Sequence, residues 1–379
     1  MRAVVWQGPR AVKVADVPEP KVKYPTDAII RMSATAICGS DLHLYDHGAQ
    51  MEMQAGDILG HEGMGTVVAV GDDVKHIAPG DTVVVPFNIS CGDCAMCLRG
   101  LYSQCATTRQ AAHGKGAALF GYTHMYGGVP GMQAEYFRVP QAHFGPIPVS
   151  ETDSPAVLLL SDVLPTAWEA VERADIVDGG SVAVFGLGPV GQMCVTAALY
   201  RGAGRVIAID EVPARLEMAS RNGAECINKS RVSSPASAIR DLTLGEGTDS
   251  VIDAVGMDAT GSRTEKILQS TRVRPDRLHA LHQSLEAVRR GGTVSVIGVY
   301  VGNMPNFPIG DLFDRQITLR WGQANVRRWD RQLLTLLRDG DRLRAEDLIT
   351  HTERLADAPA CYEKFRNKGD GMIKVVLKP

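Results

Sequence analysis

The chain has 379 residues, of which 45% are hydrophobic, and its formal net charge at pH 7 is −3. A chain of this length is expected to form two domains, each with a core of its own. The near-neutral charge gives no reason to expect a nucleic-acid partner or an anionic membrane surface. No apolar run approaches the roughly 18 residues that span a bilayer, and the N-terminus lacks the pattern of a secretory signal, so we expect a cytoplasmic protein.

Short β-strands separated by turns are predicted over the first part of the chain. The runs AVKVADV, DAIIRMSATAI, GTVVAVG and DTVVVPF are rich in β-branched residues and are bounded by Gly and Pro. From about residue 164, six apolar runs alternate with helical stretches: SVAVFG, RVIAID, ECIN, SVIDAVG, GTVSVIG and ITLRWG. This alternation is typical of βαβ units, and six buried parallel strands predict a doubly wound nucleotide-binding sheet.

Beyond the sixth run the pattern predicts a helix from Trp329 to Leu337, a loop, a second helix and a last strand, MIKVVL. We therefore divide the chain into a β-rich domain (1–163), a nucleotide-binding domain (164–322) and a C-terminal segment (323–379). The stretch from Asp258 to Leu278 is polar and rich in Arg, which predicts a surface insertion in the second domain.

Four of the eight cysteines lie close together, with the spacing C-x2-C-x2-C-x7-C: Cys91, Cys94, Cys97 and Cys105. In a long chain without a secretory signal, such clustering favours a metal site over a disulfide framework. Tetrahedral zinc takes four thiolates at about 2.3 Å, and short C-x2-C steps can supply them from one turn. With no position left for substrate, this lobe (residues 91–105) predicts a closed, structural zinc site. An iron–sulfur cluster is the competing interpretation.

A glycine motif follows the strand SVAVF and opens a helix. Its residues are Gly186, Gly188, Pro189, Val190 and Gly191. The three glycines permit a tight turn, a close approach of the backbone to a pyrophosphate and close packing of helix on strand. Asp210 ends the next strand, nineteen residues after the last of these glycines, which completes a dinucleotide fingerprint. An acidic residue there binds the ribose hydroxyls and repels a 2′-phosphate, so we expect NAD and not NADP.

Two further stretches predict a second metal site. They are CGSDLH, which begins at Cys38, and GHEGMG, which contains His61. A cysteine and a histidine on neighbouring loops suit a metal, although these residues alone leave an ordinary buried histidine as an alternative. Asp41 is a candidate acceptor for the second ring nitrogen of His61, which would select its tautomer.

The run GHEGMGTVVAVGDDV matches the signature G-H-E-x2-G-x5-G-x2-V of zinc alcohol dehydrogenases at every fixed position. Together with CGSDLH and the four-cysteine lobe, the chain resembles the zinc-dependent medium-chain dehydrogenase/reductase family over essentially its whole length. The resemblance implies an α/β protein: a GroES-like catalytic domain, interrupted by a Rossmann domain and completed by the C-terminal segment, with the active site in the cleft between them. It also implies Cys38 and His61 as ligands of a catalytic zinc.

The same resemblance implies further site residues. In the family the third ligand comes from the segment before the nucleotide fold, here LLLSDVLPTAWEA, which offers Asp162. That looks like the aspartate-ligand branch, which includes the glutathione-independent formaldehyde dehydrogenases. Glu62 is the rival third ligand. Ser40 would place its hydroxyl beside a bound alcohol, and His43 would exchange the proton with solvent, a task that suits imidazole.

Other residues are assigned by analogy, and each has an equally good structural explanation. Phe87 and Trp168 are expected in the substrate pocket, Arg215 on the adenine and Lys374 near the pyrophosphate. Glu169 is a departure, because the formaldehyde-dehydrogenase-like branch often has a histidine at this position.

The sequence as a whole thus predicts an oxidoreductase that carries two zinc ions and NAD, acts on a small alcohol or aldehyde, and assembles as a homo-dimer or tetramer. A sugar, polyol or amino-alcohol dehydrogenase of the same family is the alternative substrate class. Two other classes are a zinc-free quinone or enoyl reductase, which would lack the Cys and His ligands, and a non-catalytic NAD-binding relative. Metal analysis with a dehydrogenase assay separates them.

Overall fold

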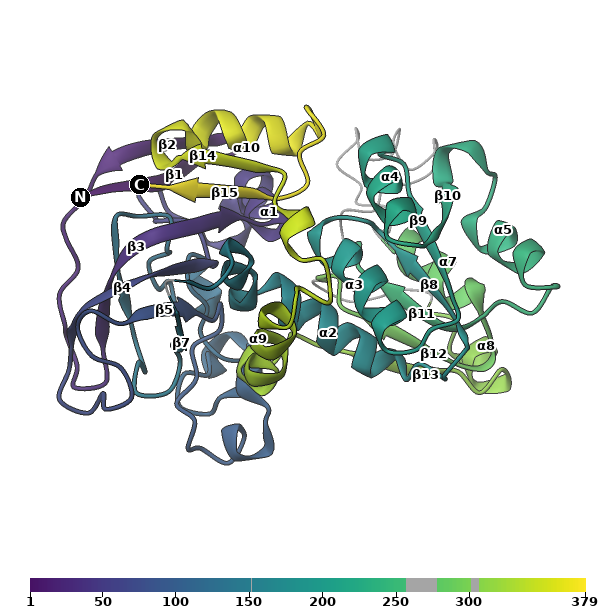
Figure 1. Ribbon diagram of the computed structural model, residues 1–379, viewed down its shortest axis with the longest axis horizontal. Coiled ribbons are helices and arrows are strands. Elements are labelled where there is room, and N and C mark those ends of the chain that lie inside the picture. The colour runs from purple at the N-terminus through teal and green to yellow at the C-terminus, as the bar shows by residue number, and fades with distance from the viewer. Residues whose placement is uncertain (151, 257–277, 301–306) are drawn as a thin grey trace. The chain divides into compact units, whose positions relative to one another are not determined.

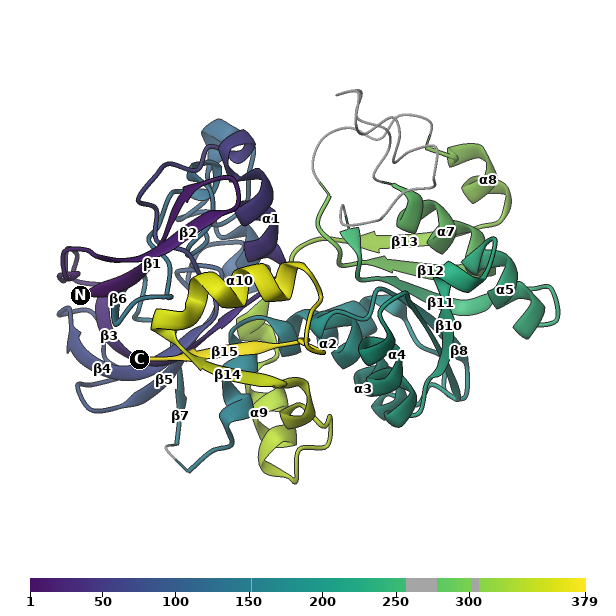
Figure 2. The ribbon, with the colours of Figure 1, turned by 90° about the horizontal axis from the view of Figure 1, so that it is seen from above.

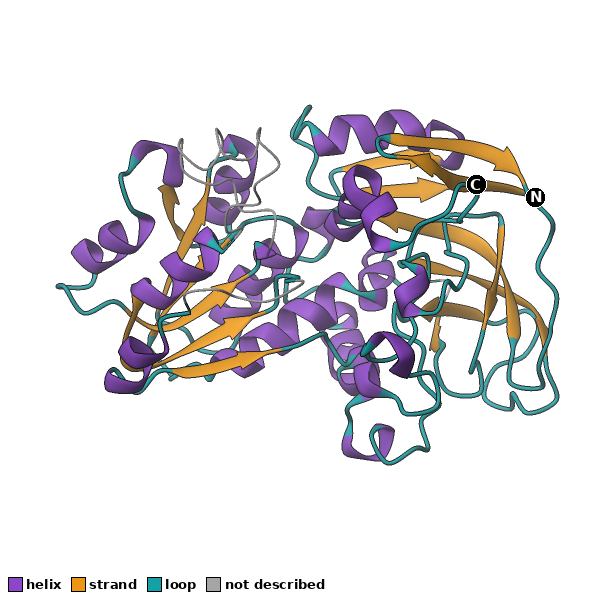
Figure 3. Cartoon of the chain, turned by 180° about the vertical axis from the view of Figure 1, so that it is seen from behind, coloured by secondary structure: helices purple, strands orange, loops and turns teal. Residues whose placement is uncertain are grey.

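The computed structural model describes residues 1–150, 152–256, 278–300 and 307–379. The chain forms two compact units: unit 1 is Met1–Pro165 with Asn325–Pro379, and unit 2 is Thr166–Ala324. Both chain ends belong to unit 1 (Figure 3). The surface insertion expected from Asp258 lies outside the described residues, apart from its last position.

Unit 1 is built mainly on antiparallel strands, and its last two strands pair with each other in parallel. The strands are β1 (Arg2–Gly8), β2 (Ala11–Asp16), β3 (Ala28–Ile37), β4 (Gly63–Val70), β5 (Thr82–Val85), β6 (Tyr136–Val139), β7 (Ile147–Val149), β14 (His351–Arg354) and β15 (Val375–Lys378). Strands β1 and β2 form a ribbon, and the larger sheet has the order β14-β15-β3-β4-β5-β7, with β6 also pairing with β3. Strand β15, from the C-terminal segment, lies beside β3 (Figure 1), so the segment completes this sheet.

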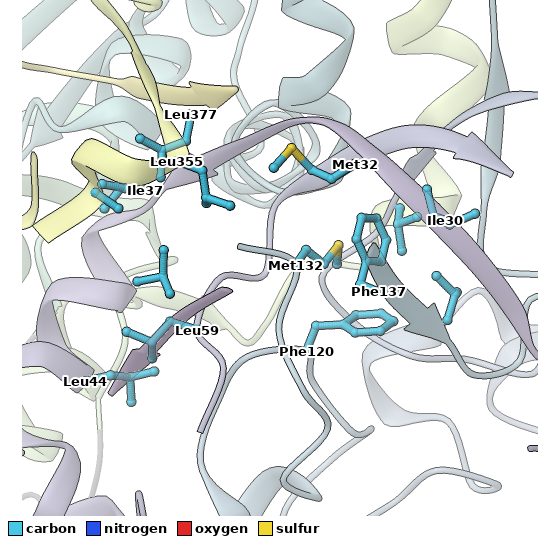
Figure 4. Close-up of a cluster of buried hydrophobic side chains, with 14 of the residues drawn as sticks. Ile30, Met32, Ile37, Leu44, Leu59, Phe120, Met132, Phe137, Leu355 and Leu377 are labelled. Carbon is cyan, nitrogen blue, oxygen red and sulfur yellow. The ribbon is translucent and has the colours of Figure 1, made fainter. Parts of the chain in front are cut away.

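The core of unit 1 lies against this sheet. Along β3 the side chains of Ile30 and Met32 are buried while those of Arg31 and Ser33 face solvent, as strand alternation requires. Figure 4 shows Ile30, Met32 and other apolar side chains from several segments gathered in this core. The helices of unit 1 are α1 (Gly39–His47), α9 (Asp330–Arg338) and α10 (Ala358–Arg366).

Unit 2 is the doubly wound sheet that the sequence predicts. Its strands are β8 (Ser181–Phe185), β9 (Arg205–Asp210), β10 (Glu225–Asn228), β11 (Thr248–Asp253), β12 (Val288–Val296) and β13 (Thr318–Trp321). They pair in parallel in the order β10-β9-β8-β11-β12-β13. The order reverses between β8 and β11, and nucleotides bind at such a switch point, outside the carboxyl ends of the strands.

Helices cover both faces of this sheet, which explains why its strands read as continuous apolar runs. The helices are α3 (Pro189–Tyr200), α4 (Pro213–Arg221), α5 (Pro235–Leu242), α7 (His279–Ala287) and α8 (Ile309–Asp314). Helices α3 and α4 lie on one side of the sheet, and α5 and α7 on the other (Figure 2). Helix α2 (Val163–Ala174) begins in unit 1 and continues into unit 2.

The four strands expected in the first part of the chain are present as β2 to β5. Strands β1, β6, β7 and β14 were not predicted. Three of these four have only three or four residues, too few to show a convincing alternation. Among the helices that the structure describes, none has the length and apolar character needed to cross a bilayer.

Candidate catalytic metal site

Three loops of unit 1 bring four potential metal ligands together. Cys38 follows the last residue of β3 and is the N-cap of α1, whereas His61 and Glu62 directly precede β4. Asp162 follows the short 3-10 helix Pro155–Ser161. All four side chains are buried, and their ligand atoms lie within 4.8 Å of one another. The fold therefore brings together the residues predicted to bind the catalytic metal, including both candidates for its third protein ligand.

The distances between these donor atoms fit a tetrahedral zinc ion. Asp162 Oδ2 lies 3.5 Å from Cys38 Sγ and 3.2 Å from His61 Nε2. Tetrahedral bonds of about 2.3 Å to sulfur and about 2.1 Å to nitrogen and oxygen would separate the same atoms by about 3.6 Å and about 3.4 Å. A thiol, an imidazole and a carboxylate are also donors that zinc accepts. Coordination by these three residues would leave the fourth position of a tetrahedral ion for a small molecule.

The cluster concentrates buried acidic groups, which a bound cation would stabilise in their ionised forms. Burial and the neighbouring Asp162 carboxylate raise the pKa of the Cys38 thiol, and burial raises the pKa of Glu62 although Lys374 opposes it. Both pKa values rise because the ionised forms are desolvated and are repelled by neighbouring carboxylates. A divalent metal reverses this balance, since it deprotonates a coordinating thiol outright.

His61 is held by contacts at both ring nitrogens. Asp41 Oδ1 lies 3.1 Å from Nδ1, and Ser40 Oγ lies 3.2 Å from Nε2, the nitrogen that faces Asp162. A carboxylate behind one nitrogen selects the tautomer that leaves the other nitrogen free to bind metal. The structure thus places Ser40 and Asp41 against His61, and it places the half-buried His43 three residues after Ser40 on α1.

Lys374 lies beside the metal cluster, against Glu62. Its ammonium pairs with Glu62 Oε1 and lies 3.4 Å from the Ile37 carbonyl oxygen, and the Lys374 and Glu62 side chains are both 0% exposed. Lys374 is thus the counter-ion of Glu62 beside the metal cluster, and its expected approach to a pyrophosphate stays a prediction. A buried charge needs such a partner because desolvation is costly.

The four-cysteine lobe has the geometry of a closed metal site. The sulfur atoms of Cys91 and Cys97 are 4.0 Å apart, those of Cys94 and Cys105 are 3.9 Å apart, and those of Cys91 and Cys105 are 3.5 Å apart. Four Zn–S bonds of about 2.3 Å in a tetrahedron give separations of about 3.8 Å. These thiols therefore fit a structural zinc ion.

Hydrogen-bond donors around the lobe favour thiolates. The backbone N–H of Ala106 donates to Cys94 Sγ at 3.2 Å, and Thr107 Oγ1 donates to Cys91 Sγ at 3.1 Å. Burial opposes ionisation, but backbone N–H groups at Cys97 and Ala106 lower the pKa of Cys94 to about 6. The thiolate is the form that binds metal. Sequence reasoning missed Thr107, whose only signal is a hydroxyl two residues beyond the last cysteine.

The three glycines of the motif in unit 2 differ in their backbone conformation and in the space around them. Gly186 has a φ of +84°, which side chains disfavour, and a Cβ on Gly191 would lie 1.8 Å from the Gly186 carbonyl oxygen. Gly188 is the N-cap of α3, and a Cβ added to it would meet nothing within 4 Å. Pro189 and Val190 form the first turn of α3. Open space beside a helix N-terminus suits a phosphate group.

Asp210 lies against this loop. Its Oδ2 accepts a hydrogen bond from the N–H of Leu187 at 2.8 Å, and its Oδ1 accepts one from the N–H of Val212 at 3.0 Å. Arg215 Nη1 lies 3.6 Å from Asp210 Oδ2. Burial acts to raise the pKa of Asp210, but Arg215 and the backbone N–H groups outweigh it and lower the pKa. The carboxylate is therefore anionic and held at the loop where we expect the nucleotide.

The two aromatic pocket candidates differ. The ring of Phe87 is half-buried and lies edge-on to the ring of His61, with centroids 6.3 Å apart, so it borders the metal cluster. Trp168 is 0% exposed and packs against Tyr200 of α3, with centroids 6.0 Å apart. In this packing Trp168 is a core residue of unit 2, and the structure gives no support for its expected place in the substrate pocket.

Glu169, the position that departs from the branch pattern, has a structural partner. Its carboxylate accepts a hydrogen bond from Arg173 at 2.6 Å, one helical turn later on α2. Arg173 also donates to the backbone carbonyls of residues 322 and 323. The pair therefore ties α2 to the stretch after β13 within unit 2, a role that no sequence pattern suggested.

Comparisons with known proteins agree with this geometry. Residues 24–149 match the family model of the alcohol dehydrogenase GroES-like domain, and residues 189–272 match that of the zinc-binding dehydrogenases. An uncharacterized zinc-type alcohol dehydrogenase-like protein of Bacillus subtilis is 40% identical over 383 residues, with 100% of both chains covered. The chain belongs to the zinc-type alcohol dehydrogenases of the medium-chain dehydrogenase/reductase family.

Two further proteins resemble this zinc-type alcohol dehydrogenase over nearly its whole length. The solved structure of an alcohol dehydrogenase from Thermus sp. ATN1 is 38% identical, has a TM-score of 0.84, and is covered to 99% by 100% of this chain. A glutathione-independent formaldehyde dehydrogenase of Pseudomonas aeruginosa is 31% identical, with 96% of this chain and 94% of that protein covered. The predicted GroES-like and Rossmann domains are confirmed, and the protein is a zinc alcohol dehydrogenase-type oxidoreductase that acts on a CH–OH group.

Proposed function

We propose that this dehydrogenase binds its catalytic zinc through Cys38, His61 and Asp162, and that it oxidises small alcohols or aldehyde hydrates with NAD. One observation carries the proposal: the Asp162 carboxylate lies at tetrahedral spacing from both the Cys38 sulfur and the His61 nitrogen. The other carboxylate of the cluster, Glu62, is paired with Lys374. Ionised Cys38 and Asp162 together would balance the charge of Zn²⁺ with His61 neutral, and the fourth position would be left for the substrate.

The chain's own residues provide the proton path. When bound, zinc would supply the Lewis acidity that makes an alcohol more acidic, and a nicotinamide nucleotide would supply the hydride acceptor. Ser40 Oγ lies 3.2 Å from the metal-facing nitrogen of His61 and is placed to accept the alcohol proton. His43 is three residues further along α1, on the same helix face, and passes the proton to solvent. Phe87 borders the cluster through its edge-on contact with His61, where its ring would shield a bound alcohol from water.

Asp162 also supports the narrower proposal that this protein is of the aspartate-ligand branch. The glutathione-independent formaldehyde dehydrogenase of P. aeruginosa is among its relatives, and the buried Asp162 carboxylate faces Cys38 and His61 as that assignment requires. Glu62 is instead paired with Lys374. This favours Asp162 over Glu62 as the third ligand.

A substrate panel tests the function directly. Purified protein loaded with zinc should contain two zinc ions per chain and should reduce NAD with primary alcohols or aldehyde hydrates. Secondary alcohols and polyols complete the panel, because turnover confined to polyols would move the protein to the alternative substrate class. Protein that holds both metals but turns over none of these compounds with either nucleotide would contradict the proposed activity.

We propose NAD as the preferred nucleotide because the anionic Asp210 lies at the glycine loop. Replacing Asp210 with serine removes a charge that repels a 2′-phosphate. We expect the ratio of kcat/KM for NAD to that for NADP to fall by at least about tenfold. The comparison is made at saturating alcohol, with Asp241→Ser, a charge change at the C-terminal end of α5, as the control. Equal use of both nucleotides by the unmodified enzyme would show that Asp210 does not face the ribose.

We also propose a homo-oligomer, a dimer or a tetramer, as the sequence analysis expects. Light scattering on the zinc-loaded protein in solution measures the mass directly. A mass of 40.8 kDa, that of one chain, at micromolar concentration would contradict this proposal.

A further inference from the structure

Three polar side chains from distant parts of unit 1 form a buried line that leads to the metal cluster. The Tyr362 hydroxyl on α10 donates to Gln133 Oε1 at 2.9 Å. The Gln133 amide donates to the Ala36 carbonyl at 3.1 Å and lies 3.4 Å from Asp41 Oδ2. Asp41 in turn contacts the Nδ1 atom of His61. We call this set, Tyr362, Gln133 and Asp41, the buried relay.

Every member of the buried relay is 0% exposed. A phenol, an amide and a carboxylate placed in a core are costly unless each finds a partner. Tyr362 otherwise lies among the apolar side chains of the unit 1 core, where a phenylalanine would serve equally for packing. The polar atoms are therefore not explained by the stability of the core alone.

Gln133 also packs directly against the loop that carries His61. A Cβ on Gly60, the residue before His61, would lie 2.4 Å from Gln133 Cγ. Backbone hydrogen bonds join the same stretches, because the N–H of Met132 donates to the Gly60 carbonyl at 2.8 Å. The Gln133 side chain thus touches the His61 loop on one side and Asp41 on the other.

We propose that Tyr362 and Gln133 are positioning residues of the catalytic metal site, which act through Asp41 to hold the His61 imidazole in its metal-binding orientation. Asp41 has two carboxylate oxygens with different tasks: Oδ1 contacts His61, while Oδ2 accepts the Cys38 N–H at 2.9 Å and faces Gln133. A donor on Oδ2 stops the carboxylate from rotating, so Oδ1 stays on His61. The inference rests on the proposed role of His61 as a zinc ligand.

The ionisation of Tyr362 agrees with its place as a donor. Burial and the Asp41 carboxylate raise the pKa of Tyr362 well above its ordinary value, so the phenol keeps its proton at any physiological pH. The Gln133 oxygen can then accept a hydrogen bond from Tyr362, and the Gln133 nitrogen can donate one toward Asp41. Neither of these two hydrogen bonds requires a group to gain or lose a proton.

The experiment measures metal release, not activity. Tyr362→Phe and Gln133→Met break the buried relay at two points while keeping the volume of each side chain. The control is Tyr45→Phe: the Tyr45 ring lies 5.5 Å from that of Tyr362, and none of the described hydrogen bonds joins its hydroxyl to the relay. Zinc-loaded proteins are mixed with a chromophoric chelator, and the catalytic and structural ions are followed as separate phases.

We expect both relay variants to release the catalytic zinc about three- to tenfold faster than wild type, with the structural zinc and the control unchanged. Groups that touch a metal ligand directly change affinity by roughly 10–100-fold, and the relay acts one step further away. Cobalt placed in the catalytic site should show shifted visible bands in Tyr362→Phe, because the imidazole tilts. A merely structural role would leave these bands in place.

Equal release rates for Tyr362→Phe, Gln133→Met and Tyr45→Phe would overturn the proposal. If neither relay variant folds with zinc present, the proposal is also overturned, because Tyr362 and Gln133 would then be needed for the stability of the unit 1 core and not for positioning His61. These outcomes differ from failure of the proposed function, in which the wild-type protein holds both zinc ions but oxidises no alcohol. In that case the release rates still decide the question of positioning.

Discussion

Asp162→Ala is expected to lose the catalytic zinc and to lower kcat/KM by at least about 1,000-fold, which corresponds to roughly 4 kcal/mol of transition-state stabilisation. Asp162 Oδ2 is the atom that lies within 3.5 Å of both the Cys38 sulfur and the His61 Nε2 nitrogen, so its removal leaves two ligands for an ion that needs at least three. The measurements are zinc content after dialysis and steady-state kinetics with the best alcohol of the panel.

The matched control is Glu62→Gln, which should retain the catalytic zinc. Its amide oxygen still accepts a hydrogen bond from Lys374, although the buried ammonium loses its counter-charge and some stability goes with it. A structure with Glu62 bonded to zinc at about 2.0–2.2 Å and Asp162 turned away would reverse the ligand assignment. The dehydrogenase function would survive that result.

Cys105→Ser is expected to destabilise unit 1 by about 3–5 kcal/mol, because it opens a closed thiolate site whose metal contributes folding free energy. Cys105 is 0% exposed, and its sulfur lies 3.5 Å from that of Cys91, so a serine cannot complete the tetrahedron. Differential scanning calorimetry should show unit 1 melting roughly 10 °C lower, and elemental analysis should find about one zinc ion fewer per chain.

Cys226→Ser provides the comparison for this variant, because Cys226 is an exposed cysteine on β10 of unit 2. It should keep both metals and the wild-type melting temperature. Cys105→Ser protein that also keeps two zinc ions and melts with the wild type would refute a structural metal in the lobe.

The cysteine spacing and the glycine motif were readable from the sequence because each is local. A turn must place Cys91, Cys94 and Cys97 together whatever the rest of the chain does. The close contact between Gly186 and Gly191 likewise depends only on the six residues from Gly186 to Gly191, which lead from the end of β8 into α3. The cluster of Cys38, His61 and Asp162 is not local, and only its resemblance to a family motif brought these residues together before the fold was known.

The remaining features depend on pairings that sequence spacing does not encode. Tyr362 meets Gln133 across 229 residues, and Lys374 meets Glu62 across 312. A lysine in an apolar strand-like run gives no sign of which carboxylate it will face. The same holds for Trp168: an aromatic residue near a site motif can point into a pocket or into the core, and the sequence does not encode its packing against Tyr200.

The return of the chain to unit 1 sets an order of events during synthesis. A ribosome makes Cys38, His61 and Asp162 first, then the whole of unit 2, and only afterwards α10 and β15. Making unit 2 takes roughly ten to thirty seconds at the usual speed of translation. Throughout that time β3 has an unpaired edge, and His61 and Glu62 lack Tyr362 and Lys374. The nascent protein therefore contains Cys38, His61 and Asp162 well before the segments that pack around them, and we expect the site to be completed only when the C-terminal segment docks.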